Sequence, residues 1–174
     1  DINKDTTYQL ILSAQEFGHK VFYLIPETLS TNPNGPAGKI GDLKINKKKD
    51  PFFKISNIKS KQLSNFDYIL MRKDPPVDNN YIYITQILDS INQKTSKVIN
   101  PGFVLRNHNE KLITLNFPKY IPASLVSCSK DDIHKFRNIH KNIILKPLNL
   151  MGGRSVYFLE EKDKNFNVIF EEIT

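Results

Sequence analysis

Residues 142–160 read NIILKPLNLMGGRSVYFLE, two short apolar runs on either side of a turn that carries paired glycines. The runs from Asn142 to Lys146 and from Ser155 to Glu160 are rich in β-branched and aromatic residues, which is typical of strands. Glycines let backbone N–H groups approach phosphate oxygens closely, and a lysine at a strand end supplies positive charge. The stretch therefore predicts two strands joined by a cationic pocket. A plain β-hairpin with an exposed lysine is the alternative.

Upstream of this stretch, the sequence alternates helical and strand patterns. A helix begins after an N-cap at Asp5 or Thr6, carries apolar residues at three-to-four spacing and ends near Gly18. The segment from His19 to Ile25 predicts a strand, and the apolar run from Asp67 to Met71 predicts a strand buried on both faces. Because no strand precedes the first helix, we expect the first strand of a βαβ unit to be missing from this sequence.

The remaining elements follow from periodicity and from turn residues. We predict a domain boundary between residues 100 and 109. Before this boundary, the sequence predicts a loop over 26–50 with a short hairpin near 39–45, a strand over 52–55, a helix over 80–93 and a strand over 97–100. From this boundary onward, the sequence predicts short helices over 103–107 and 109–116, a strand over 120–126, a helix capped by Ser129, and a strand or helix from Phe166. The apolar face of the capped helix is predicted to consist of Ile133, Phe136 and Ile139. The order favours an α/β fold with helices on the faces of an open sheet.

Composition narrows the class of protein. With 174 residues, 39% of them hydrophobic and 25% charged, the chain has enough apolar surface for a packed core. No apolar run approaches the roughly 20 residues that cross a bilayer, and no secretory leader is recognisable, so we expect no membrane partner. The single cysteine, Cys128, excludes an internal disulfide and suits a reducing compartment.

The formal net charge of +7 points to an anionic partner. Nucleic-acid-binding surfaces cluster their basic residues and place arginine at base edges. Here the lysines are scattered, apart from the run Lys47-Lys48-Lys49, and only four of the 25 basic residues are arginine. We therefore expect a nucleotide or an acidic metabolite rather than nucleic acid. A non-catalytic basic module that binds nucleotide or nucleic acid is kept as an alternative.

Two further segments carry polar groups suited to a ligand. Lys111 could meet Lys146 across a cleft and share one polyphosphate; the alternative for Asn109-Glu110-Lys111 is an acidic first turn of a helix. Arg72 and Asp74 follow the expected buried strand, at the sheet edge where ligands of open α/β sheets gather. Arg72 can bind a carboxylate through two parallel hydrogen bonds, or it can pair with Asp74. The histidines lack the spacing of metal ligands.

Several motifs, in this order, resemble those of the bacterial glutathione synthetase family of ATP-grasp ligases. They are Asp5-Thr6-Thr7, Ile69-Leu70-Met71-Arg72-Lys73-Asp74-Pro75-Pro76, Asn109-Glu110-Lys111-Leu112, and Ile143-Ile144-Leu145-Lys146-Pro147-Leu148 with Met151-Gly152-Gly153. The resemblance runs along essentially the whole chain, which corresponds to one part of a family member. It implies a Rossmann-like pre-ATP-grasp domain over 1–108, with a parallel sheet whose first strand is missing, and the beginning of an α+β ATP-grasp domain over 109–174.

The resemblance also implies an activity, glutathione synthase. ATP phosphorylates the cysteinyl carboxylate of γ-glutamylcysteine, and the amine of glycine then displaces phosphate from the acyl phosphate. The implied ligand-binding residues are Lys111, Lys146, Gly152, Gly153 and Ser155 for ATP, and Arg72 and Asp74 for substrate. No catalytic residue is assigned within this piece, and the Mg²⁺ ligands are expected beyond Thr174. We expect a cytoplasmic enzyme that is a homo-oligomer at full length, and no catalysis by the truncated chain alone.

The sequence departs from the family pattern at two positions, where Asp-Gly usually precedes Met-Gly-Gly. Asn149 keeps a hydrogen-bonding side chain without the charge, and Leu150 places a Cβ where a glycine is free to take a positive φ. Another ATP-grasp carboxylate–amine ligase is a second alternative. The run from Met71 to Pro76 argues against it.

Overall fold

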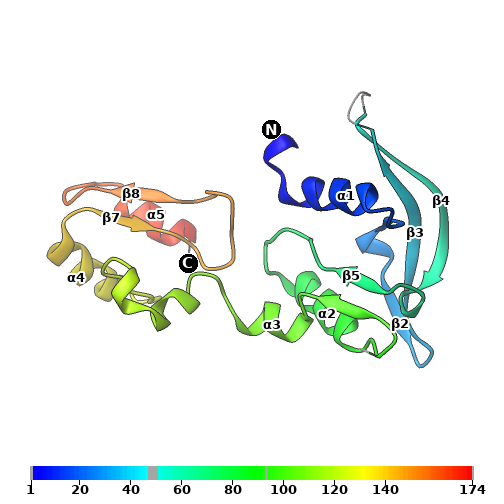
Figure 1. Ribbon diagram of the computed structural model, residues 1–174. Coiled ribbons are helices and arrows are strands. Elements are labelled where there is room, and N and C mark those ends of the chain that lie inside the picture. The colour runs from blue at the N-terminus through cyan, green and yellow to red at the C-terminus, as the bar shows by residue number, and fades with distance from the viewer. Residues whose placement is uncertain (1, 47–50, 93, 174) are drawn as a thin grey trace. The chain divides into compact units, whose positions relative to one another are not determined.

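The computed structural model describes residues 2–46, 51–92 and 94–173 of the chain, and Figure 1 shows its helices and strands, most of them labelled. The chain folds into two compact units: the first comprises Asp1–Lys73 and Tyr83–Phe103, and the second comprises Asp74–Ile82 and Val104–Thr174. None of the helices within the described ranges combines the length and the apolar character that a membrane crossing requires. The lysine run of residues 47–49 lies outside the described residues.

The larger sheet of the first unit is antiparallel and is built around one long strand. Its strands are β1 (Phe22–Leu24), β2 (Ser30–Asn32), β3 (Gly35–Ile45) and β4 (Phe53–Gln62). Strand β3 pairs with β1 and β2 at successive positions and with β4 along most of its length. The strand predicted over 19–25 is confirmed in its core as β1, but its partner β3 runs antiparallel to it, whereas a βαβ unit would give it a parallel neighbour.

The loop predicted over 26–50 is wrong from residue 30 to residue 45, where β2 and β3 lie. Its glycines indicated a loop, yet two of them serve close packing inside β3. A Cβ on Gly38 would lie 2.5 Å from Leu24 Cδ1, and a Cβ on Gly41 would lie 2.5 Å from Ile55 Cγ2. Glycine in a strand interior often marks such a close approach. The strand predicted over 52–55 is present, and it continues to Gln62 as β4.

Helix α1 (Thr6–Glu16) begins and ends where the sequence predicts. The carboxylate of Asp5 accepts a hydrogen bond of 2.7 Å from the backbone N–H of Tyr8, which is the N-cap contact, and Gly18 follows with a φ of 80°. Gln15 fastens the helix to β3: its side-chain amide donates to the carbonyl of Leu43 at 2.8 Å and accepts from the N–H of Ile45 at 3.2 Å. One side chain thus satisfies two groups of the β3 backbone.

The second sheet of the first unit is parallel, as predicted for this part of the chain. Strand β5 (Tyr68–Leu70) pairs with β6 (Lys97–Ile99), and Ile69 lies opposite Val98. The prediction that β5 is buried on both faces is wrong, because Tyr68 and Leu70 are exposed on one face. Helix α2 (Asn79–Asp89) matches the helix predicted over 80–93, and its predicted apolar face is buried at Tyr81, Leu88 and the following Ile91. The core of this unit contains Ile40, Leu63, Leu88, Ile91 and Val98.

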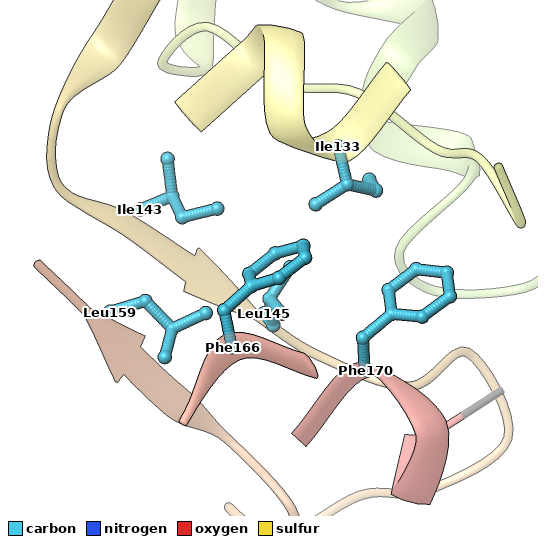
Figure 2. Packing of buried hydrophobic residues seen from close by; sticks show 6 residues of the cluster. All are labelled: Ile133, Ile143, Leu145, Leu159, Phe166 and Phe170. Atoms are coloured by element: carbon cyan, nitrogen blue, oxygen red, sulfur yellow. The ribbon is translucent and has the colours of Figure 1, made fainter. Parts of the chain in front are cut away.

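The second unit has its own core beneath a two-stranded hairpin. Helix α4 (Lys130–His140), strands β7 (Ile143–Leu145) and β8 (Tyr157–Leu159), and helix α5 (Phe166–Ile173) enclose it. The two strands pair antiparallel, with Ile144 opposite Phe158. Figure 2 shows the apolar side chains from all four elements pointing toward one another: Ile133, Ile143, Leu145, Leu159, Phe166 and Phe170. Both strands predicted from residues 142–160 are therefore confirmed, and the segment from Phe166 is a helix.

The apolar face predicted for α4 is wrong at one position. Ser129 caps the helix as expected, accepting from the N–H of Asp132 at 3.3 Å. Ile139 is 72% exposed, however, and Arg137, 5% exposed, occupies the buried side of the last turn. Its guanidinium donates to the carbonyls of Glu160 and Asp163. Burial of an arginine is stable when its N–H groups find acceptors, and a hydropathy pattern does not register this.

Short helices and irregular backbone connect these elements. They are α3 (Gly102–Asn107) and the 3-10 turns Ile2–Lys4, Pro26–Thr28, Leu63–Asn65, Ile113–Asn116 and Pro118–Tyr120. Helix α3 confirms the helix predicted over 103–107, whereas the helix predicted over 109–116 is reduced to turns that end in a 3-10 segment. The strand predicted over 120–126 is wrong, since this stretch has no strand pairing. Pro122 lacks the N–H that a strand ladder needs.

Candidate functional site

Lys146 stands at the end of β7, on the outer face of the hairpin. Burial alternates along 143–147: Ile143, Leu145 and Pro147 are buried, and Ile144 and Lys146 are exposed. This period of two places Lys146 on the same face as Ile144. Ile144 is 57% exposed, and Phe158, directly opposite it on β8, is 61% exposed. The outer face therefore offers an apolar platform that ends in a cationic side chain.

The segment from Pro147 to Val156, which we call the glycine loop, connects β7 to β8. Gly152 and Gly153 have φ angles of 67° and 78°, and Ser155 has a φ of 51°. A Cβ added to either glycine would meet nothing within 4 Å. Glycine is therefore needed here for its backbone conformation and not for space. Leu150 is not among the residues with positive φ, so its Cβ is compatible with the backbone that it adopts.

Three successive carbonyl groups of the glycine loop accept hydrogen bonds from residues far away in the sequence. The side-chain amide of Asn109 donates to the carbonyl of Leu148 at 2.8 Å. The backbone N–H of Val77 donates to the carbonyl of Asn149 at 3.3 Å. The ammonium of Lys111 donates to the carbonyl of Leu150 at 2.7 Å. These contacts fix the first half of the loop, all within the second unit.

Lys111 is held in place by contacts of both its backbone and its side chain. Its backbone N–H donates to the side-chain oxygen of Asn109 at 2.9 Å, and its ammonium forms an ion pair of 3.0 Å with Glu110. The side chain is 22% exposed. An ammonium carries three N–H donors. Among the described residues, Glu110 and Leu150 take two of them, which leaves the third for an external acceptor such as a phosphate oxygen.

The glycine loop follows Lys146 directly in the chain, and the ammonium of Lys111 contacts it. Lys111 contacts the loop at Leu150, four residues after Lys146. Because an extended chain spans at most about 3.5 Å per residue, the Cα atoms of residues 146 and 150 lie within about 14 Å of each other. The Lys111 ammonium therefore binds a carbonyl whose residue lies within about 14 Å of the Cα atom of Lys146.

The remaining predicted site residues lie elsewhere. Arg72 is exposed, and its Nε donates to the hydroxyl of Thr7 at 3.1 Å, which joins two of the motifs that carried the family resemblance. Asp74 is exposed and belongs to the second unit, whereas Arg72 belongs to the first. Within the described ranges, no group of three histidine, cysteine or carboxylate side chains is suited to hold a metal ion. Burial raises the pKa of Tyr81, a residue of α2.

Sequence reasoning missed two contributors to the site, Asn109 and Val77. The sequence does not assign Asn109 a contact of its own, but asparagine commonly bonds the backbone two residues ahead of it, and that tendency is a usable signal. Val77 acts through its backbone N–H, which its side chain does not reveal. Its contact with Asn149 depends on the tertiary fold alone.

The hairpin platform, the positive-φ glycines and the lysine-bound loop define an α/β chain with a site suited to a polyphosphate ligand. The chain belongs to the prokaryotic glutathione synthetase family. The family model "Prokaryotic glutathione synthetase, N-terminal domain" matches residues 1–106, and the model "Prokaryotic glutathione synthetase, ATP-grasp domain" matches residues 110–174.

Curated relatives agree with this assignment. The chain is 39% identical over 175 residues to the glutathione synthetase of Buchnera aphidicola subsp. Baizongia pistaciae, and 40% identical over 174 residues to that of Yersinia pestis. It is 37% identical over 177 residues to the glutathione synthetase of Vibrio parahaemolyticus. Each alignment covers 100% of this chain and 54–55% of the relative, so the chain spans about half the length of the curated relatives it matches.

Proposed function

We propose that these residues belong to a glutathione synthase, which uses ATP to join γ-glutamylcysteine to glycine. The observation that carries the proposal is the contact of 2.7 Å between the Lys111 ammonium and the carbonyl of Leu150. It brings a second lysine to the glycine loop, which directly follows Lys146 in the chain. The names of the relatives and of the family models give glutathione as the product and an ATP-grasp domain, and the resemblance of the motifs implies γ-glutamylcysteine and glycine as the other substrates.

The proposed reaction has two steps and balances in charge and atoms. The cysteinyl carboxylate of γ-glutamylcysteine attacks the γ-phosphorus of ATP, which forms an acyl phosphate and releases ADP. The amine of glycine then attacks the acyl carbon, and phosphate leaves as the peptide bond forms and the amine loses a proton. Phosphoryl transfer depends mainly on positioning and on electrostatic stabilisation of charge on the phosphate oxygens. Lys111 and Lys146 are suited to that task.

The geometry of the second unit supports one arrangement of the nucleotide. The apolar platform of Ile144 and Phe158 suits a flat base, because exposed apolar and aromatic side chains pack against π-systems. The backbone at Gly152, Gly153 and Ser155, with positive φ throughout, suits phosphate oxygens. Lys146 lies where the platform meets the loop. The proposed ATP site therefore runs from the hairpin face to the glycine loop.

We assign the rest of the chain by the same family membership. Residues 1–108 form a Rossmann-like pre-ATP-grasp domain in this proposal, and residues 109–174 form the beginning of an ATP-grasp domain. Arg72 and Asp74 are proposed to contact the peptide substrate. The proposal includes Mg²⁺ as the companion of ATP, but the described residues do not form a site for it, so no step is assigned to the ion. We further propose a cytoplasmic homo-oligomer that does not use nucleic acid as a partner.

The test is nucleotide binding by the protein expressed from its complete reading frame. Isothermal titration with a non-hydrolysable ATP analogue should detect binding, and Lys146→Met should weaken it by at least tenfold, because loss of one phosphate-contacting cation costs on the order of 1.5–3 kcal/mol. Lys135→Met is the matched control, since Lys135 has a side chain 76% exposed on α4 and forms a surface ion pair with Asp132.

Two results would contradict the proposal. One is the absence of nucleotide binding by the parent protein. The other is equal affinity of the Lys146→Met variant and the parent. A panel of carboxylate and amine substrates then separates glutathione synthase from other ATP-dependent carboxylate–amine ligases: consumption of ATP should require γ-glutamylcysteine and glycine together.

A further inference from the structure

The side chain of Asn109 connects the backbone of Lys111 to the glycine loop. Its oxygen accepts from the N–H groups of Lys111 and Leu112 at 2.9 and 3.3 Å, and its amide donates to the carbonyl of Leu148 at 2.8 Å. The partners fix the orientation of the amide, because the two N–H groups require an acceptor and the carbonyl requires a donor. A rotated amide would lose all three contacts.

These contacts set where the Lys111 side chain starts and what it can reach. Asn109 holds the main chain of Lys111 on one side and Leu148 on the other, and Leu148 lies two residues before the carbonyl that the Lys111 ammonium binds. The hydroxyl of Thr114 donates to the carbonyl of Lys111 at 2.6 Å, so the peptide groups on both sides of this residue are held. The direction of Lys111 is therefore determined before any ligand is bound.

We propose that Asn109 is a positioning residue, which acts through Lys111 to hold the ammonium and the glycine loop in register for the phosphates. The inference rests on the proposed function, because it takes the Lys111 ammonium to meet ATP. Asn109 itself has its side-chain oxygen and amide engaged within the protein and acts without contacting the ligand. A site ordered in advance binds more tightly, because less conformational freedom is lost on binding.

The tether between Asn109 and the loop has a readout that needs no nucleotide. Arg154 is exposed in the glycine loop and is a target for trypsin. Cleavage of a folded protein follows the population of locally opened states. Asn109→Ala removes all three contacts of the side chain, and Asn109→Asp keeps the acceptor but places a carboxylate oxygen against the carbonyl of Leu148. Both variants should be cleaved after Arg154 about fivefold to tenfold faster than the parent, as loss of a hydrogen bond predicts.

The control for these variants is Asn138→Ala, the same substitution at an exposed position of α4. It should be cleaved after Arg154 at the rate of the parent. If Asn109→Ala and Asn109→Asp also match the parent, the tether does not restrain the loop and the proposal is overturned.

A double-mutant cycle separates positioning from a general loss of structure. In the protein from the complete reading frame, Asn109→Ala should weaken binding of the ATP analogue about tenfold, the change produced by loss of roughly 1.4 kcal/mol. In a Lys111→Met background, the same substitution should change affinity less than about twofold, because contacts that act through one group are not additive. A merely structural role would weaken binding equally in both backgrounds and would overturn the proposal.

Nucleotide binding by the parent protein distinguishes a failure of this inference from a failure of the proposed function. Absence of nucleotide binding by the parent contradicts the proposed function and removes the part of the inference that concerns phosphate, while the trypsin experiment still decides whether Asn109 restrains the loop. Binding by the parent with no coupling between residues 109 and 111 contradicts the inference alone.

Discussion

Replacement of Arg137 by methionine tests how the hairpin that carries the site is held to α4. Arg137 is 5% exposed, and its Nε donates to the carbonyl of Glu160 at 2.9 Å, while Nη2 donates to the carbonyl of Asp163 at 3.1 Å. Its guanidinium carbon lies 5.3 Å from the centre of the Phe166 ring. Methionine keeps an unbranched apolar stem and removes the donors and the charge. The substitution therefore removes these polar contacts while keeping most of the packing.

The expected cost follows from these contacts. A hydrogen bond that involves a charged group contributes about 1.5–3 kcal/mol, but Glu160 is exposed, so water can replace the arginine at its carbonyl. Asp163 is half-buried, so water replaces the arginine less readily at its carbonyl, and the loss of this hydrogen bond costs more free energy. The contact with the ring adds about 0.5–1 kcal/mol. Arg137→Met should therefore lower the free energy of unfolding by about 2–4 kcal/mol.

The assay is urea unfolding followed by circular dichroism, because the sequence contains no tryptophan for fluorescence. The midpoint of the transition should fall in proportion to the lost free energy, with an unchanged slope. Arg137→Lys should lie between the parent and Arg137→Met, since a lysine keeps the charge but cannot bond two separate carbonyls through a planar fork. Lys135→Met on the same helix should stay within about 0.5 kcal/mol of the parent. A loss below about 0.5 kcal/mol for Arg137→Met would show that these contacts do not stabilise the unit.

Two further perturbations test the backbone of the loop and the titration of a buried tyrosine. Gly152→Ala should lower the free energy of unfolding by about 1 kcal/mol through its φ of 67° alone. Gly152→Asn should lower it less, because asparagine tolerates the left-handed region. Equal effects of the two substitutions in urea unfolding would contradict this reasoning. The raised pKa of Tyr81 means that the folded state favours the neutral phenol, so stability is intact below about pH 10 and falls as the pH rises toward the folded-state pKa, by up to about 1.4 kcal/mol per pH unit. Tyr81→Phe should remove that component of the pH dependence, and an identical alkaline loss in the variant would assign it to other groups.

The sequence predicts best where one short stretch determines the outcome. The Asp5 and Ser129 caps of α1 and α4 involve partners three residues away, and both contacts are present. The strands predicted over 142–146 and 155–160 follow from short runs of β-branched and aromatic residues, and both are present as β7 and β8. Local contacts of this kind require no knowledge of the remaining chain.

Prediction from sequence fails where distant residues decide the conformation. Gly38 and Gly41 suggested a loop, but their lack of a Cβ allows Leu24 and Ile55 to pack against β3. Ile139 was predicted on the buried face of α4, but Arg137 is buried there instead, because two carbonyls beyond β8 accept hydrogen bonds from it. The same holds at the candidate site, since the contact of Asn109 with Leu148 joins residues 39 apart in the chain.

The contacts to the glycine loop explain how the chain accommodates its departure from the family pattern at residues 149 and 150. The donors that reach this part of the loop bind the carbonyls of Asn149 and Leu150 and do not bind their side chains. A carbonyl is present whatever the side chain, so these contacts do not distinguish Asn-Leu from Asp-Gly. The residues of the loop that have a positive φ are Gly152, Gly153 and Ser155, and the two glycines of the Met-Gly-Gly run are retained there. The hydrogen bonds to the carbonyls of residues 149 and 150 therefore do not depend on which side chains stand at these two positions.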